Sequence, residues 1–260
     1  MLKTVSSALL LILLSVPAWA QETDTERAAA RSVLQKMTAL ESSLEVPAMV
    51  AKLTGPNAER DAVVARAKEL MDKELLAMAD DIATHPEIGF EEKRSTAKLI
   101  DYLRQHNFSI ETNTANMPTA FVAKFRGNNG EPHMGVILEY DALRGTKGAF
   151  HGDQHSAQGP VGIAVAVAMS EYLTRTHTPG SVTVFGTPGE EMMPPNAKTE
   201  MHQAHAFDGM DVIVRSHSSA QTSRPAAGFG TCCMNIDGVK YTFSGAPAHQ
   251  LTSWNGRNAL

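Results

Sequence analysis

Two adjacent glutamates, Glu190 and Glu191, have residue types and a setting that suit catalysis. They end the segment Gly186-Thr187-Pro188-Gly189-Glu190-Glu191, which follows an apolar, strand-like run. Neighbouring carboxylates repel each other, and a metal ion would offset that repulsion, with the first as general base and the second as ligand. The alternative is a solvated acidic turn at the start of a helix, which is the more common setting of an isolated Glu-Glu pair.

A second polar segment, His151-Gly152-Asp153-Gln154-His155, leads into an apolar stretch. Imidazole and carboxylate are the ligands that zinc prefers besides thiolate, so His151 and Asp153 are candidate metal ligands and His155 is a reserve ligand. Packing alone does not easily explain three such side chains in one glycine-containing loop. The alternative is a polar loop that binds no metal.

A third signal is His217, at the end of the strand-like run Val214-Arg215-Ser216-His217. A single histidine in such a place is usually structural. Together, however, the three segments offer neutral nitrogens and anionic oxygens, which suit two borderline metal ions about 3.5–4 Å apart. Such ions lower the pKa of a bound water and polarise a carbonyl, so the combination predicts a hydrolase.

The elements that must position these residues alternate between strands and helices. Short β-rich runs occupy residues 119–125, 134–140, 181–187 and 211–216, and helical patterns occupy residues 92–106, 161–173 and 197–206. This alternation predicts βαβ units in a three-layer α/β/α domain with a mostly parallel sheet. Ligands gather at the carboxyl ends of the strands in such sheets, and the candidate residues follow those ends.

The N-terminus has the three parts of a secretory signal: Lys3, an apolar run, and Ala18-Trp19-Ala20 before the cleavage position. We therefore expect cleavage after Ala20 and a periplasmic or secreted protein. No stretch reaches the roughly 20 apolar residues of a membrane helix, so no stable membrane anchor is expected. The net charge of -5, without a basic stripe, argues against nucleic acid as a partner.

Five segments, in this order, make the chain resemble the dinuclear-metal family of aminoacylases and carboxypeptidases. The resemblance is to the branch of hippurate, auxin-conjugate and aminobenzoyl-glutamate amidohydrolases. The segments are His85-Pro86-Glu87-Ile88-Gly89-Phe90-Glu91-Glu92, Glu139-Tyr140-Asp141-Ala142-Leu143, Gly186-Thr187-Pro188-Gly189-Glu190-Glu191, Phe207-Asp208-Gly209, and Ser244-Gly245-Ala246-Pro247-Ala248-His249 with Gly256-Arg257-Asn258-Ala259-Leu260.

The resemblance implies a role for each matching residue. Glu190 resembles the general base that deprotonates a metal-bound water, and Glu191 and His217 resemble metal ligands. His249 resembles the lid-domain histidine that reaches the substrate across a dimer interface and stabilises the developing oxyanion. The implied cofactors are two divalent ions, zinc first, with manganese or cobalt as alternatives. The implied assembly is a homodimer formed through the lid domain.

The metal loop departs from the family pattern, which has Cys-Gly-His followed by Asp or Asn. Here the corresponding place reads His151-Gly152-Asp153-Gln154, so imidazole replaces thiolate and carboxylate replaces imidazole. Both replacements bind metal, so we predict a site with altered ligands. Imidazole bridges two ions poorly, so either Asp153 bridges them or the site holds one ion.

The second departure concerns the C-terminal part of the pattern. We divide the chain into a signal peptide (1–20), an N-terminal helical segment (21–79), a catalytic domain without its last strands (80–228) and the beginning of a lid or dimerisation domain (229–260). Residues 255–260 are expected to begin a helix, and Cys232 and Cys233 to be small core residues rather than a disulfide. We expect this form, made alone, to be poorly folded or inactive.

The sequence therefore predicts an exported, metal-dependent amidohydrolase. Its substrate would be an N-acyl amino acid, an aminobenzoyl-glutamate-like compound or a small peptide. The alternative from another class is a catalytically inactive, truncated remnant that only binds metal or peptide. A nucleotide-binding domain is disfavoured because no glycine-rich phosphate loop follows the first strand.

Overall fold

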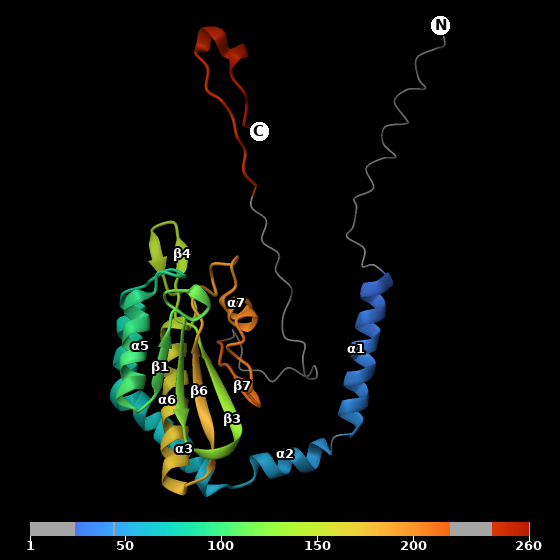
Figure 1. Cartoon of the computed structure of the whole chain (residues 1–260), viewed down its shortest axis with the longest axis vertical. Coiled ribbons are helices and arrows are strands. Elements are labelled where there is room, and N and C mark those ends of the chain that lie inside the picture. The colour runs from blue at the N-terminus through green and yellow to red at the C-terminus, as the bar shows by residue number, and fades with distance from the viewer. Residues whose placement is uncertain (1–23, 44, 219–240, 260) are drawn as a thin grey trace. The chain divides into compact units, whose positions relative to one another are not determined.

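The structure is a computed structural model, and it describes residues 24–43, 45–218 and 241–259. The chain divides into two compact units, and the α/β fold lies in the unit that begins at Asn57 (Figure 1). The other unit contains α1 (Asp24–Ser43) and α2 (Val46–Thr54). No helix of the described part is long and apolar enough to cross a membrane.

A five-stranded sheet forms the centre of the α/β unit. Its strands, in spatial order, are β1 (Ser109–Thr112), β2 (Phe121–Arg126), β6 (Pro179–Gly186), β3 (Asn128–Leu138) and β7 (Val212–Val214). The strands β6, β3 and β7 are parallel neighbours, whereas β2 is antiparallel to both β1 and β6. All strands except β2 therefore run in the same direction, which confirms the predicted mostly parallel sheet.

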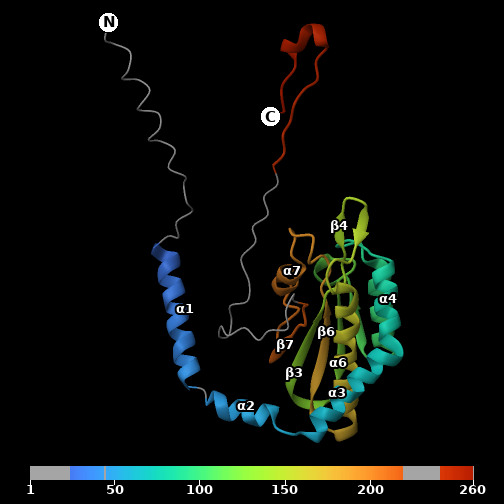
Figure 2. The same cartoon turned by 180° about the vertical axis from the view of Figure 1, so that it is seen from behind.

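Helices cover both faces of the sheet, which confirms the three-layer arrangement. One face is covered by a helical layer made of α3 (Ala58–Leu70), a π-helical turn (Met71–Leu75), α4 (Leu76–Thr84), α5 (Lys93–Gln105) and α6 (His155–Thr176). The opposite face carries α7 (Ala197–Gln203). In Figure 1, α5 and α7 accordingly lie on opposite sides of the sheet, and Figure 2 shows α4 and α7 on opposite sides from behind.

The period of the strands explains why both faces are covered. Side chains of a strand alternate between faces, so a strand that is apolar at consecutive positions must be buried on both sides. In β6, Val182 and Val184 belong to the core under α6, whereas Phe185 belongs to the core under α7. The sheet is thus held by two apolar cores, and its strand ends are fixed relative to each other.

The N-terminal helical stretch breaks at residues 55–57, where the run Gly-Pro-Asn disfavours a continuous helix. Gly55 ends α2 and Asn57 caps α3, since its side chain accepts a hydrogen bond from the Arg60 backbone N–H at 2.8 Å. The helical stretch then continues to Thr84, and α3 and α4 pack against α6. Residues 58–84 are therefore part of the packed α/β unit, and the predicted limit at residue 79 remains a prediction.

Several smaller elements were not predicted. They are β1, the hairpin of β4 (Leu143–Gly145) and β5 (Gly148–Phe150), and the 3₁₀ turn Thr114–Asn116. The helix α6 begins at His155, before the expected residue 161, because Pro160 is accommodated inside the helix. His155 therefore lies on a helix and not in a loop.

The prediction that a helix begins at residues 255–260 is wrong. A 3₁₀ helix (Gln250–Asn255) ends there, and Gly256 has extended backbone angles, φ -83° and ψ 164°. Arg257 pairs instead with Ala246 in an isolated antiparallel bridge. That bridge holds the segment extended, so the helical pattern of the last residues does not develop. The cysteines, at 232 and 233, lie outside the described residues.

Candidate metal centre

Three strand ends and one helix start meet at the same edge of the sheet. Glu139 and Asp141 follow β3, Glu191 follows β6, and His217 follows β7. His155 is the first residue of α6, the helix that packs on β3 and β6. The parallel strands bring these side chains together although they are far apart in the sequence, as the rule for parallel sheets predicts.

The buried imidazole of His155 lies at the centre of this group. Its side chain has 0% exposure, and its Nε2 lies 3.2 Å from Asp153 Oδ2 and 3.5 Å from Glu139 Oε2. Its Nδ1 lies 3.2 Å from Asp141 Oδ1. Burial lowers the pKa of His155, but contact with Asp141 and the charges of Asp153, Asp141 and Glu139 outweigh it and raise the pKa to about 9.

Local backbone geometry explains why the ring lies there. Asp153 Oδ1 accepts a hydrogen bond from the backbone N–H of His155 at 2.9 Å, at the positive end of the α6 dipole. Gln154 is the N-cap, and its carbonyl accepts from the N–H of Ala157 at 2.7 Å. The loop thus turns sharply into the helix and directs His155 toward the ends of the strands.

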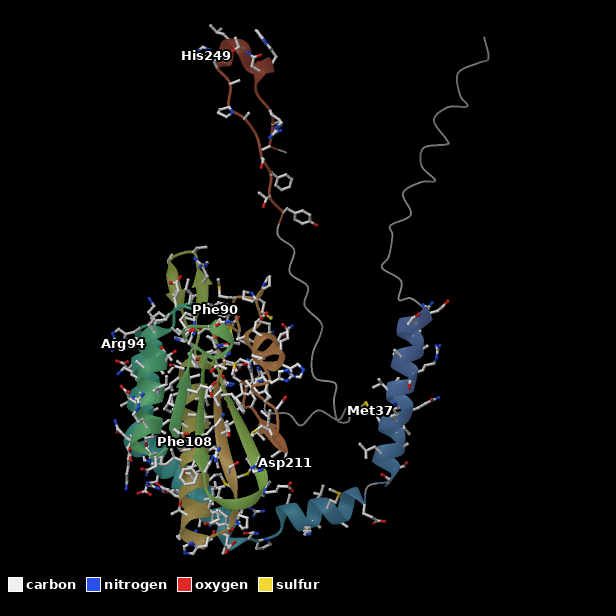
Figure 3. The ribbon with its side chains drawn as sticks, in the orientation of Figure 1. Met37, Phe90, Arg94, Phe108, Asp211 and His249 are labelled. Carbon is white, nitrogen blue, oxygen red and sulfur yellow. The ribbon has the colours of Figure 1, made fainter. Side chains whose placement is uncertain are left out.

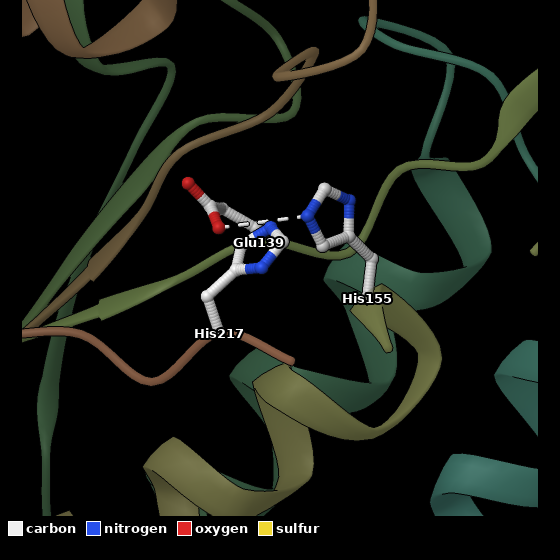
Figure 4. A group of neighbouring side chains, drawn as sticks. All are labelled: Glu139, His155 and His217. Carbon is white, nitrogen blue, oxygen red and sulfur yellow. Dashed lines mark ion pairs between the residues drawn. The ribbon is translucent and has the colours of Figure 1, made fainter. Parts of the chain in front are cut away.

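Two overlapping sets of side chains could each hold a metal ion. Asp153, His155 and Glu191 form one set, and Glu139, His155 and His217 form the other. In each set the ligand atoms lie within 4.8 Å of one another. Figure 4 shows the second set, with His155 facing Glu139 and the ring of His217 nearby. His155 is common to both sets.

Glu139 already has cationic partners from the protein. Its Oε1 lies 2.5 Å from Lys198 Nζ and 2.7 Å from Arg215 Nη1. Its Oε2 accepts a hydrogen bond from Gln158 Nε2 at 2.9 Å. Burial raises the pKa of Glu139, but the charges and hydrogen bonds of Lys198 and Arg215 outweigh it and lower the pKa below its usual value. Glu139 is therefore a fully buried, ionised and neutralised carboxylate.

Glu191 has no such partner within the described ranges. Its backbone N–H donates to Asp141 Oδ2 at 2.8 Å, which fixes the turn that carries it. Burial, a hydrogen bond with Asp153 and the charges of Asp153 and Glu190 raise the pKa of Glu191 to about 7. Carboxylates that raise each other's pKa in this way are stabilised by a shared cation.

Buried polar atoms without partners indicate what that cation contacts. Among the described residues, Asp141 Oδ1, His155 Nε2 and both ring nitrogens of His151 are buried and accept or donate no hydrogen bond. Such atoms are rare in native proteins, and they are often found where a protein binds an ion. An imidazole nitrogen that gives up its proton to a metal, beside anionic oxygens, suits a borderline divalent ion such as zinc, so the residues present fit the predicted metal.

The predicted ligands are placed as follows. Asp153 and Glu191 meet in one set and His217 in the other, where its Nδ1 lies 2.8 Å from the Ser218 carbonyl oxygen. His151 is in neither set; burial lowers its pKa despite the charges of Asp153 and Asp141. Its role as a ligand remains a prediction.

Two predicted functional residues are less constrained. The half-buried Glu190 adjoins Glu191 and contributes to the rise in the pKa of that residue. His249 precedes the 3₁₀ helix of the segment 241–259, where its Nδ1 accepts from the Leu251 N–H at 3.2 Å (Figure 3). The predicted roles of Glu190 as base and of His249 in substrate contact stay predictions.

Sequence reasoning placed Glu139 and Asp141 in a segment of the family resemblance but gave them no role at the site, and it kept His155 only in reserve. The signal was present, because both acids interrupt an apolar run and are fully buried in the structure. Charged residues are almost never fully buried unless they are paired or bind a metal, so acids in a strand-like apolar run are candidate site residues.

Comparisons with known proteins find relatives among amide-bond hydrolases. No family model matches the chain. It is 33% identical over 198 residues to a subunit of p-aminobenzoyl-glutamate hydrolase of Escherichia coli K12, covering 70% of this chain and 40% of that protein. It is 29% identical over 214 residues to Xaa-Arg dipeptidase of Homo sapiens, covering 75% and 47%. The chain therefore spans less than half the length of these two relatives.

The fold also matches a solved structure. A crystal structure of a candidate aminohydrolase from methicillin-resistant Staphylococcus aureus superposes with a TM-score of 0.52 and 20% sequence identity. The match covers 59% of this chain and 41% of that one. At this identity the likeness supports the fold, and the functional argument depends on the site and on the two sequence relatives.

Proposed function

The chain is a homologue of amide-bond hydrolases of the dinuclear-metal aminoacylase and carboxypeptidase family, and from this premise we propose that it is an exported, metal-dependent amidohydrolase. Its substrate is an N-acyl amino acid, an aminobenzoyl-glutamate-like compound or a small peptide. The relatives are named for hydrolysis of p-aminobenzoyl-glutamate and for cleavage of Xaa-Arg dipeptides, and both reactions break an amide bond.

One observation carries the proposal: Nε2 of the buried His155 imidazole lies 3.2 Å from Asp153 Oδ2 without a hydrogen bond, and among the described residues neither Asp153 nor Glu191 pairs with a lysine or arginine. Asp153, His155 and Glu191 would hold one divalent ion, and His217 would contribute to a second. We propose zinc, with manganese or cobalt as alternatives. When bound, such ions polarise the scissile carbonyl and lower the pKa of a water molecule.

The remaining steps belong to residues of the chain. Glu190, half-buried beside Glu191, takes a proton from the attacking water and passes it to the leaving amine. His151 adds an imidazole with two unpartnered nitrogens at the rim of the site. His249 would contact the substrate from a second copy of the chain, so the active form is a homodimer. The signal-like N-terminus supports export to the periplasm or beyond.

Replacing the proposed base tests the mechanism. In a chain that spans the full length of these relatives, we expect Glu190→Gln to lower hydrolysis of p-aminobenzoyl-glutamate or an Xaa-Arg dipeptide by about 10²–10⁴-fold, because a positioned base contributes that much. Metal content, measured by elemental analysis, should not change. The matched control is Glu91→Gln, which replaces an exposed glutamate of the same unit and should leave both readouts unchanged.

Two results would contradict the proposal. Undiminished hydrolysis by the Glu190→Gln variant would exclude this residue as the base. Bound metal without hydrolysis by the unaltered full-length chain would favour the alternative, a chain that only binds metal or peptide. For export, mass spectrometry of the secreted protein should find Gln21 as the new N-terminus, and retention of the first twenty residues would exclude the proposed cleavage.

A further inference from the structure

Glu92 is a fully buried carboxylate that belongs to neither set of candidate ligands. Its Oε1 accepts a hydrogen bond from the backbone N–H of Gly189 at 2.8 Å. Its Oε2 accepts from Thr119 Oγ1, also at 2.8 Å. Within the described ranges no Lys, Arg or His forms an ion pair with it. Glu92 therefore binds the backbone just before Glu190 and Glu191 without a cationic partner.

Close packing fixes the same point of the chain. Gly189 has φ +66°, and a Cβ there would lie 2.6 Å from the ring of Phe90. A Cβ on Gly89 would lie 2.6 Å from the Cα of Gly189. The two segments touch through their backbones, so neither glycine accepts a side chain without displacing the other segment. Phe90 is labelled in Figure 3.

The turn between Gly189 and Glu191 is thus held at both ends by buried carboxylates. Glu92 binds the Gly189 N–H, and Asp141 binds the Glu191 N–H at 2.8 Å. Between these points stands Glu190, the proposed base. Ligands and bases are precise only when a second layer of hydrogen bonds fixes them, and here that layer acts on the backbone.

A purely structural role does not explain a carboxylate at this position. Burial raises the pKa of Glu92 to about 7 despite the hydrogen bonds from Thr119 and Gly189, so the ionised form is disfavoured in the folded chain. An apolar side chain of similar volume would fill the same space without that cost. What it would lack is the acceptor for the Gly189 N–H.

We propose that Glu92 is a positioning residue, which holds the Gly189 N–H and so sets the Glu190-Glu191 turn for metal binding and catalysis. This inference rests on the proposed metal-dependent function. It predicts that losing the acceptor weakens metal binding even where the fold is intact. It also predicts that keeping the acceptor without the charge preserves metal binding.

The variants Glu92→Met and Glu92→Gln test these two predictions separately. Methionine fills the space without an acceptor, and we expect the affinity for Zn²⁺, measured by competition with a chromophoric chelator, to fall about 10–100-fold. Glutamine keeps a carbonyl oxygen for Gly189 and should restore the affinity to near the unaltered value. Far-UV circular dichroism should show native helix content and an undiminished melting temperature for both variants.

Glu87→Met is the matched control. Glu87 also accepts backbone hydrogen bonds, from Arg94 N at 2.9 Å and Ser95 N at 2.8 Å, but these bonds cap α5 and involve no residue of the Gly189–Glu191 turn. We expect this variant to lower the melting temperature and to leave Zn²⁺ affinity unchanged. A role limited to stability would give the same pattern for Glu92.

Gly189→Ala changes the turn itself instead of its hydrogen-bond acceptor. It is the replacement test if Glu92→Met does not fold. Its Cβ would push the turn away from Phe90, so Zn²⁺ affinity should again fall. Unchanged affinity in either folded variant would overturn the positioning role while leaving the metal site intact. Absence of Zn²⁺ binding by the unaltered chain would overturn both the proposed function and this inference.

Discussion

The carboxylates on the two sides of His155 are stabilised in different ways. On one side, Glu139 is fully buried and paired with Lys198 and Arg215. On the other, Asp153 and Glu191 lie together with no lysine or arginine in ion-pair distance among the described residues. The consequence is opposite for the two glutamates: the pKa of Glu139 is lowered and the pKa of Glu191 is raised to about 7.

The difference shows which carboxylate belongs to the scaffold and which is available to a ligand. Lys198 and Arg215 are part of the chain, so they neutralise Glu139 even when no metal is bound. Glu139 then orients His155 and Gln158 from behind, as acids behind metal-binding histidines do. Asp153 and Glu191 keep their charge for an exchangeable cation. Each side can be tested by removing its carboxylate.

The largest effect is expected for Glu139→Gln. Removing the charge leaves Lys198 and Arg215 facing a neutral amide inside the protein, and breaking a buried ion pair costs about 3–5 kcal/mol. We expect the free energy of unfolding of the metal-free chain, measured by urea titration, to fall by about that amount. The double variant with Lys198→Met should recover part of the loss. An unchanged free energy of unfolding would contradict the conclusion that Glu139 belongs to the scaffold.

Glu92 extends the comparison, because it is a buried carboxylate with neither a cation nor a place among the ligands. Its pKa rises from 4.5 to about 7 on folding, mainly through burial. Between these pH values the unfolded chain has lost a proton that the folded chain keeps. The stability of the unaltered chain therefore falls as the pH rises through this window and stays lowered above it.

Glu92→Gln removes the titrating group, so its advantage over the unaltered chain should grow with pH. The span from 4.5 to about 7 corresponds to at most about 3 kcal/mol. We expect the difference in free energy of unfolding to be small at pH 4.5 and to reach its full size above pH 7. A difference that does not change with pH would mean that Glu92 titrates alike in both states.

Glu191→Gln should affect binding and not folding. It removes one anionic ligand, so Zn²⁺ affinity should fall at least about tenfold, equivalent to about 1.4 kcal/mol. It also removes repulsion from Asp153 and Glu190, so the metal-free chain should unfold no more easily than before. Chelator competition and urea titration measure the two quantities. A destabilised metal-free chain would place Glu191 with Glu139 as part of the scaffold.

The sequence predicted the sheet and the edge at which the site lies. Strand periods and the alternation with helices sufficed for that, because burial on two faces makes the C-terminal halves of β6 and β3 largely apolar. Glu191 and His217 were found for the same reason, since each follows a strand. These signals are local in the sequence, and the parallel strands bring the residues that carry them to the same edge of the sheet.

The sequence could not predict which member of the His151 to His155 segment occupies the centre. That depends on where α6 begins, and the helical pattern predicted a start at residue 161, later than the start at His155 in the structure. It also could not predict that Glu139 is neutralised, because Lys198 and Arg215 come from α7 and from the end of β7. Their meeting is a property of the assembled layers.

The smallest effect is expected for Glu171→Gln, which tests whether burial or pairing causes the loss at Glu139. Glu171 binds Arg66 with two hydrogen bonds of 2.7 and 3.0 Å, a geometry as good as that at Glu139. Its side chain is 40% exposed, however, and that of Arg66 is 35% exposed. Water and salt screen such pairs, so the free energy of unfolding should fall by less than about 1 kcal/mol. The loss should shrink further in about 1 M salt, whereas the loss for Glu139→Gln should persist, because buried charges are screened far less. Equal losses for the two variants would show that pairing alone, and not burial at the metal edge, distinguishes Glu139 from Glu191.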